Sequence, residues 1–232
     1  QKPYARIIND KVSAGMTGVT ASLSFDPSIS QATYKLFRFA EGEETDANNS
    51  VALASGTIYR TTYSQSIYIG PGKMSAGDRL VIELEAGGVK TLSEPVEVQP
   101  SPDWGEPYVV FAQAAAAPSD RSVSVSIDYA DEYLEMGDDF YCDVSVYQVP
   151  AWYTDEQIED NEIWENMAVC KRVAQNNSNF NEITRGQFEL SILDGVELEP
   201  ESRLFIKLRL PHVEWEGEEV DYLSASIPVL RE

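Results

Sequence analysis

Apolar residues alternate with small polar residues along several short segments of the chain. Segment 19–25 places Val, Ala, Leu and Phe at its odd positions, with Thr and Ser between them. Segments 123–129, 80–84 and 204–210 follow the same alternation. A period of two residues is typical of a strand that buries one face. Turn sequences such as Pro71-Gly72 separate these segments, so the pattern predicts an all-β chain.

The two halves of the chain repeat each other. Segments 4–7 and 19–25 match segments 108–111 and 123–129 at an offset of 104 residues. The remaining pairs follow at increasing offsets: 34–39 with 142–147 at 108, 50–53 with 166–169 at 116, 78–84 with 202–208 at 124, and 93–98 with 224–229 at 131. Because the offset never decreases, we interpret the second half as a copy of the first with four insertions. The alternative is that any two β-sandwiches can be aligned by sliding one alternating pattern along the other.

Each half holds about seven predicted strands in about a hundred residues, which indicates an antiparallel β-sandwich. We expect two tandem seven-stranded, Ig-like modules at residues 1–99 and 108–232, joined by a proline-rich linker at 100–107. Thr154 and Gln157 have the spacing of a helix-capping box. The second module is therefore expected to carry a short inserted helix.

The strand at 77–84, followed by the segment 93–98, resembles the end of the tandem immunoglobulin-like or fibronectin-III-like modules of bacterial extracellular and cell-surface proteins. The resemblance covers nearly the whole chain at the level of pattern. Neither half has the Cys…Trp…Cys spacing of antibody domains, so the disulfide-free bacterial modules are the closer match. The resemblance implies a secreted spacer, adhesion segment or accessory domain of a carbohydrate-active enzyme, with a protein or polysaccharide partner.

The chain is strongly acidic, with 39 acidic and 17 basic residues and a net charge of −22. Such a chain repels phosphate backbones and anionic lipids, which argues against nucleic-acid and membrane-surface partners. The longest apolar runs are too short to span a bilayer, and no secretory leader is visible at the N-terminus, so we expect any leader to have been removed. Residues 1–99 hold 9 basic and 11 acidic side chains, whereas the remainder holds 8 and 28. Nearly all the acidity therefore belongs to the second module and the linker.

Acidic side chains are expected to gather at one pole of the second module. In a seven-stranded sandwich, the second and sixth loops lie at the pole where the first strand begins, which here follows the linker. The residues concerned are Asp103, Glu106, Asp131, Glu132 and Glu216. A hard cation would relieve their mutual repulsion, so a junctional Ca²⁺ site is one interpretation. The other is a solvated acidic rim that keeps the protein soluble.

The four tryptophans all lie outside the first module. Trp152 and Tyr153 are adjacent in an insertion, and such a pair offers an apolar platform on which a sugar ring can stack. Asp155 and Gln157 would then bind the sugar hydroxyls, and Trp215 is a further candidate in the last hairpin. These residues predict a ligand-binding surface on the second module, for carbohydrate in the sharpest version. The alternative is that each tryptophan packs its own loop onto the sandwich, with the Trp152–Tyr153 pair serving as a hydrophobic staple at the start of the helix.

Cys142 and Cys170 are the only cysteines, and both lie in the second module. The sequence leaves two alternatives open, a disulfide between these cysteines or two buried free thiols. The chain has one histidine, His212, and no nucleophile, zinc or nucleotide-binding motif beside it. We therefore expect no catalytic residues and no cofactor other than the Ca²⁺ considered above.

Overall fold

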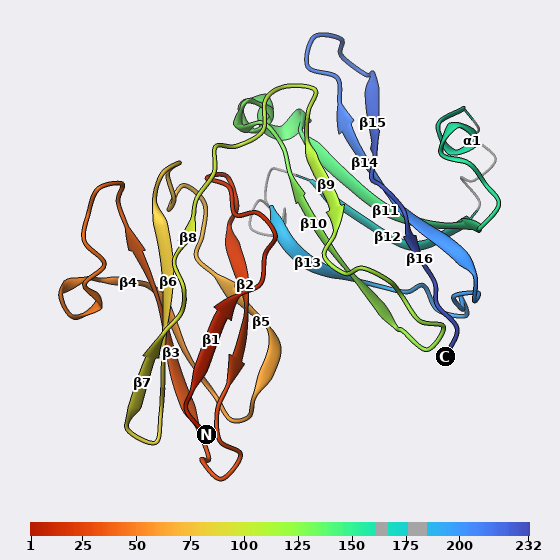
Figure 1. The fold of residues 1–232 in the computed structure, drawn as a ribbon. Helices are drawn as coiled ribbons and strands as arrows, with labels where there is room; N and C mark the ends of the chain where they lie inside the picture. The colour runs from red at the N-terminus through yellow and green to blue at the C-terminus, as the bar shows by residue number, and fades with distance from the viewer. Residues whose placement is uncertain (161–166, 176–184) are drawn as a thin grey trace. The chain divides into compact units, whose positions relative to one another are not determined.

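The computed structural model describes residues 1–160, 167–175 and 185–232. The chain forms two compact units, one of residues 1–101 with 185–187 and one of residues 102–184 with 188–232. Both consist mainly of strands (Figure 1). In the described part of the chain, no helix has the length and apolar composition needed to cross a membrane.

The first unit contains eight strand segments and one short helix. The segments are β1 (Tyr4–Ile7), β2 (Gly18–Ser24), β3 (Ala32–Phe39), β4 (Ala52–Ile58), β5 (Thr62–Tyr68), β6 (Arg79–Ala86), β7 (Val89–Leu92) and β8 (Val96–Glu97), with the 3-10 helix η1 (Ala47–Asn49) before β4. One sheet has the order β1-β2-β5 and the other β4-β3-β6-β7. Both β7 and β8 pair with β6. They are two parts of one interrupted strand, which gives the predicted count of seven.

The second unit repeats this arrangement. Its segments are β9 (Tyr108–Phe111), β10 (Ser122–Asp128), β11 (Tyr141–Pro150), β12 (Ala168–Gln175), β13 (Gly186–Ser191), β14 (Ser202–Pro211), β15 (Glu219–Leu223) and β16 (Ile227–Pro228). The sheets have the orders β13-β10-β9 and β12-β11-β14-β15, and β16 also pairs with β14. Among the described residues of this unit, two helices are inserted, the 3-10 segment η2 (Asp131–Asp139) and α1 (Asp155–Asp160). The all-β class, the two sandwiches and the inserted helix are therefore as predicted.

The alternation read from the sequence decides which side chains fill each sandwich. In β2, Val19, Ala21 and Leu23 are almost completely buried. In β14, Leu204, Ile206 and Leu208 belong to the core of the second unit. Burial of these apolar faces is the main source of stability of such a fold.

Strand registers show that the two units are built alike. Arg6 pairs with Ser22, and at an offset of 104 Val110 pairs with Ser126. In the other sheet, the pairing of Leu80 with Val96 corresponds to that of Leu204 with Ile227. These pairs have the predicted offsets of 124 and 131 residues. Equal registers in both sheets support a duplication, because pattern sliding alone would not produce them.

The alignment of the third strands was wrong by two residues. Leu36 pairs with Ile82, and Val146 pairs with Ile206, so Leu36 corresponds to Val146 at an offset of 110 and not 108. A register irregularity follows in both units, between Leu36 and Phe37 and between Val146 and Tyr147. A shift of two residues leaves the alternation unchanged, which is why the pattern could not detect it.

Candidate functional site

The candidate site lies on the outer face of the larger sheet in the second unit. Along β11 and β14, side chains alternate between the sandwich core and this outer face, as strand geometry requires. Tyr147 and Phe205 lie on the outer face and stack with ring centroids 5.5 Å apart. With Val149 and Ile158 they form a second buried apolar cluster, against which Tyr153 and Leu223 pack. We call this group the outer cluster.

Helix α1 covers the outer cluster through Ile158, which is 5% exposed. The helix begins at the predicted capping box. The backbone N–H of Gln157 donates to the Thr154 hydroxyl at 3.2 Å, and the Thr154 N–H donates to the Gln157 amide oxygen at 2.9 Å. Two amide groups at the helix start are thereby satisfied. The Gln157 amide oxygen therefore has a structural role in addition to any contact with a ligand.

Arg203 of β14 connects the helix start to the sheet. Its guanidinium donates to the carbonyl of Tyr153, to Asp155 Oδ1 at 3.1 Å and to the Ser226 hydroxyl at 3.2 Å. One side chain thus connects β14 with two segments that are distant in sequence, residues 153–155 and Ser226. Charge-assisted hydrogen bonds of this kind are stronger than neutral ones and fix geometry.

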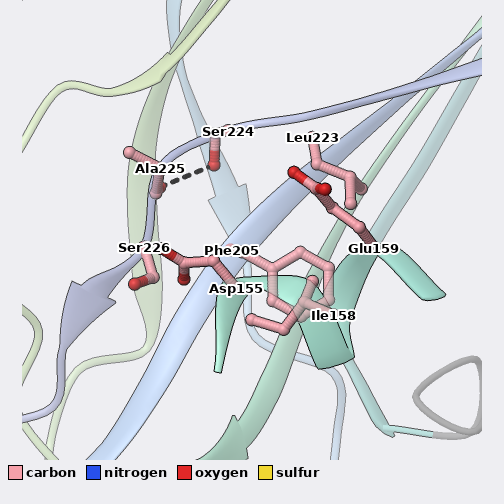
Figure 2. Close-up of a pocket in the computed structure, with 8 residues that line it drawn as sticks. All are labelled: Asp155, Ile158, Glu159, Phe205, Leu223, Ser224, Ala225 and Ser226. Atoms are coloured by element: carbon pink, nitrogen blue, oxygen red, sulfur yellow. Dashed lines mark hydrogen bonds between the residues drawn. The ribbon is translucent and has the colours of Figure 1, made fainter. Parts of the chain in front are cut away.

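A cavity of about 210 Å³ opens beside α1 (Figure 2). Phe205, Ile158 and Leu223 give it an apolar wall, and Asp155 and Glu159 place carboxylates at its edge. The segment 224–226 completes the lining. The combination of an apolar surface with a few polar groups is typical of small-ligand sites, although the cavity is smaller than most.

The predicted aromatic pair lies next to this helix. Trp152 is 71% exposed, and its ring centroid is 4.9 Å from that of Tyr153. The two rings are inclined at 44°, so they do not form one flat surface. Tyr153 packs against the outer cluster, whereas Trp152 presents its indole to solvent. The expectation that this pair packs its loop onto the sandwich thus describes Tyr153 but not Trp152.

Trp215 is not part of this site. It lies in the β14–β15 turn, beyond the end of β14 opposite to Arg203. It is 59% exposed and stacks on His212, with ring centroids 4.4 Å apart and an angle of 8°. His212 Nδ1 accepts hydrogen bonds from the backbone N–H groups of Glu214 and Trp215. This histidine therefore shapes the turn.

The second and sixth loops of the second unit meet at one pole, where Glu216 lines a cavity and the other four predicted acidic residues do not. A cavity of about 560 Å³ there is lined by Met136, Asp139 and Tyr141 and, from the end of β14 and the sixth loop, by residues 211–214 and 216–219. Trp104 of the linker stacks edge-on with Tyr133 of η2, at 4.4 Å between centroids. Burial, and then a hydrogen bond with Tyr222, raises the pKa of Tyr133 above its usual range.

The calcium interpretation gains no support from this pole. In the part of the chain that the structure describes, no three His, Cys, Asp or Glu side chains are grouped so that they could hold a metal ion. This includes the five predicted residues Asp103, Glu106, Asp131, Glu132 and Glu216. Neighbouring carboxylates have protein partners instead. Glu219 accepts from the Tyr141 hydroxyl at 2.6 Å, and Asp221 accepts from Arg209 at 2.7 Å.

The disulfide between Cys142 and Cys170 does not form. Both thiols are free and buried. Across the β11–β12 ladder, Cys142 pairs with Ala174 and Cys170 pairs with Val146. Cys142 and Val146 are four residues apart on β11, roughly 13 Å at strand spacing, which exceeds the reach of a disulfide. Burial raises the pKa of each thiol to about 12.

A third cavity, in the first unit, was not predicted from the sequence. It is lined in part by Tyr59, Arg60 and Tyr63 around the β4–β5 turn. The available signal was the run Tyr-Arg-Thr-Thr-Tyr, which places two aromatic residues in a polar turn where no core needs them.

Comparisons with known proteins do not identify the chain. No family model matches it. No curated protein matches it either. Among solved structures, chicken CNTN1 FN1-FN3 domains align with 98% of this chain at 14% identity and a TM-score of 0.26. The chain spans 66% of the length of that structure. The β-sandwich assignment rests on the strand pairing described above.

Proposed function

We propose that this chain is a non-enzymatic, extracellular binding module and spacer whose ligand surface is the Trp152 turn of the second unit. The observation that supports this most is the exposure of Trp152 on a turn held by Arg203 and by the capping box. Transfer of the apolar surface of an exposed indole from water to a partner's surface is favourable, so burial of Trp152 would stabilise a complex. Because the turn is already ordered, a partner pays little conformational entropy to bind it.

The partner is a protein or polysaccharide at a cell surface, with carbohydrate as the more specific alternative. The Asp155 and Glu159 carboxylates, and the cavity beside α1, favour carbohydrate because they can accept hydrogen bonds from sugar hydroxyls next to an aromatic face. The net charge of −22 favours neutral or cationic partners and opposes nucleic acid.

Tryptophan fluorescence titrated with soluble neutral polysaccharides tests the carbohydrate alternative. Saturable quenching is expected, and it should be lost in Trp152→Ala. Trp215→Ala is the matched control, because its indole is similarly exposed but lies beyond the other end of β14. If quenching persists in Trp152→Ala and disappears in Trp215→Ala, the surface is assigned to the wrong pole.

Retention of a protein partner on the immobilised chain tests the broader proposal in the same way. Purified surface proteins of the source cell are the probe, and Trp152→Ala is expected to reduce retention about tenfold or more, as for a binding hot spot. Equal retention by Trp152→Ala and the unmodified chain would overturn the assignment of this turn.

A further inference from the structure

The cavity of the first unit has the size of a small-molecule site. Its volume is about 420 Å³, within the range of about 300–1,000 Å³ that is usual for such sites. Ser24 and Phe25 at the end of β2 and Ile29 in the next loop form one side. Tyr59, Arg60 and Tyr63 from the β4–β5 turn form the other. We call it the tyrosine cavity.

Two tyrosines lie open to solvent at this cavity. Tyr59 is 73% exposed and Tyr63 is 78% exposed. A register irregularity between β2 and β5 places Tyr63, since Ala21 pairs with Gln65 but Leu23 pairs with Thr62. Such a bulge redirects a side chain that regular alternation would place elsewhere. Among the described residues, neither phenol has a hydrogen-bond partner, so both hydroxyls remain available to a ligand.

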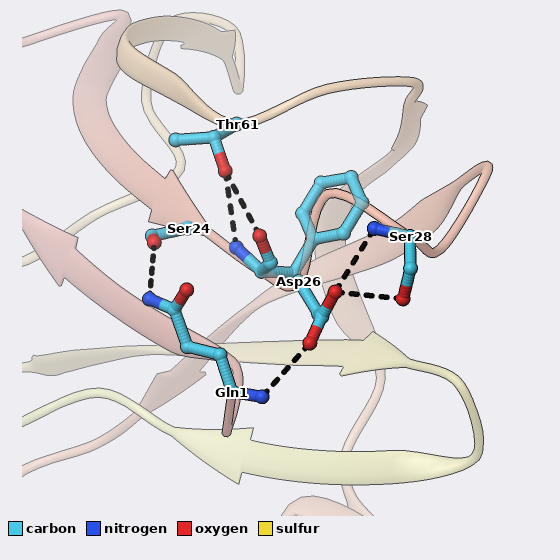
Figure 3. A network of polar contacts seen from close by, with 6 residues as sticks. Gln1, Ser24, Asp26, Ser28 and Thr61 are labelled. Atoms are coloured by element: carbon cyan, nitrogen blue, oxygen red, sulfur yellow. Dashed lines mark hydrogen bonds and ion pairs between the residues drawn. The ribbon is translucent and has the colours of Figure 1, made fainter.

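The walls of the tyrosine cavity are held in place before any ligand arrives (Figure 3). The Thr61 hydroxyl accepts from the Phe25 N–H and donates to the Phe25 carbonyl, each at 3.2 Å. This links the β4–β5 turn to the end of β2. In the adjoining loop, Asp26 Oδ1 accepts from the Ser28 N–H at 2.9 Å and from its hydroxyl at 2.7 Å. A preformed site loses little conformational entropy on binding.

Arg60 supplies positive charge to the tyrosine cavity. Its side chain is exposed, and within the described part of the chain it makes no ion pair. The hydrogen bonds from Ser28, and then the N-terminal ammonium of Gln1 at 2.9 Å, hold the pKa of Asp26 well below its usual range, so that this carboxylate is ionised and already paired. The first ninety-nine residues are almost neutral, with 9 basic and 11 acidic side chains. An anion can therefore approach this surface at lower cost than the acidic second unit.

We propose that the tyrosine cavity binds a carboxylate-bearing sugar residue of the uronic acid type. The sugar ring stacks its C–H face on Tyr59 or Tyr63. The planar guanidinium of Arg60 donates two parallel hydrogen bonds to the carboxylate. The phenol hydroxyls of Tyr59 and Tyr63 pair with the sugar hydroxyls. An acidic peptide pairs with Arg60 equally well, but its carboxylates leave the two exposed tyrosine rings without a stacking partner. We therefore favour the sugar.

Calorimetry with an oligogalacturonate and the full chain tests this proposal. Saturable heat is expected, together with at least about tenfold weaker binding of the neutral galactose oligomer of equal length, since a hydrogen-bonded charge is lost. Arg60→Gln is expected to abolish that difference. Arg6→Gln is the matched control, because Arg6 is also exposed in the first unit and does not line the cavity.

The aromatic contribution is tested by Tyr59→Ala and Tyr63→Ala, with Tyr68→Ala as the control for loss of an exposed ring outside the cavity. Each cavity variant is expected to weaken the oligogalacturonate several-fold or more, and the control is not. All measurements are repeated in Trp152→Ala, which should leave this binding unchanged. The result is therefore independent of the function proposed for the second unit.

Three outcomes would overturn the proposal. The first is absence of heat with millimolar oligogalacturonate, and the second is equal affinity for the charged and neutral oligomers. The third is binding of an oligoglutamate, sensitive to Arg60→Gln, where oligogalacturonate does not bind. That result would assign the cavity to acidic peptides.

Discussion

Ser93 and Ser224 make the same hydrogen bond in the two units. The Ser93 hydroxyl accepts from the backbone N–H of Ile82 at 2.9 Å, and the Ser224 hydroxyl accepts from that of Ile206 at 2.8 Å. Each serine N–H also donates back to the carbonyl of the same isoleucine. Ser93 lies between β7 and β8, and Ser224 lies between β15 and β16. Their hydrogen bonds continue the strand pairing across the interruption in each unit. The two isoleucines match at the offset of 124 residues and the two serines at the offset of 131. This shared pair of hydrogen bonds supports common descent of the units more strongly than the apolar pattern does.

Replacing either serine by alanine should destabilise its own unit alone. A buried N–H left without an acceptor costs about 1–3 kcal/mol. Ser93→Ala is expected to speed hydrogen exchange at the Ile82 amide, and Ser224→Ala at the Ile206 amide, each without effect on the other unit. Ser66→Ala, at an exposed position of β5, is the control. Equal acceleration in both units by a single variant would contradict this expectation.

The two buried thiols should make the protein sensitive to alkaline pH. Burial raises the pKa of Cys142 and Cys170 from 9.0 to about 12. Between these values, the unfolded chain releases protons that the folded chain keeps, so the free energy of unfolding falls as pH rises from 9 towards 12. Urea denaturation at several pH values measures the slope. Cys142→Val with Cys170→Val should flatten it relative to the unmodified protein.

The same thiols should react slowly in the folded state. At pH 8 a maleimide is expected to modify neither cysteine in buffer and both in denaturant, because thiolate is the reactive species and both groups are buried. The intact mass without reductant should correspond to two free thiols. A mass lower by two hydrogens would show the disulfide that the register excludes.

Arg203 should determine the order of the Trp152 turn. Arg203→Met removes the donors to Tyr153, Asp155 and Ser226 and is expected to cost about 1–3 kcal/mol. The local readout is faster hydrogen exchange at the amide of Ile158. Arg203→Lys should recover part of the protection. Arg231→Met is the control, since the exposed pair of Arg231 with Glu201 is expected to contribute about 1 kcal/mol or less.

The sequence predicted most of the framework because burial imposes a period of two on every strand. The same period explains the error in the third strand, since a slip from 108 to 110 keeps every apolar residue on its face. The choice between a disulfide and two free thiols also depends on the strand register. Cys142 and Cys170 lie on the neighbouring strands β11 and β12, but their separation along the ladder depends on a register that composition does not determine.

Candidate site residues were predictable where local chemistry placed them. The capping spacing of Thr154 and Gln157 located α1, and the adjacency of Trp152 and Tyr153 indicated an aromatic surface. The role of Arg203 was not predictable, because its three partners come from segments distant in sequence. Tyr63 was missed for a related reason, since its orientation follows from a bulge between strands and not from its neighbours in the chain.

The irregularity shared by the two units constrains how the protein can be rebuilt. In β4, Leu53 is the additional residue between the partners of Leu36 and Phe37, and in β12 Val169 is the additional residue between the partners of Val146 and Tyr147. Each hairpin thus contains its own additional residue, which sets the register of its two strands. A chimaera that exchanges the whole β3–β4 hairpin for β11–β12 conserves the strand pairing. A crossover inside the hairpin that omits the additional residue would instead move the core-facing side chains of one strand to its outer face.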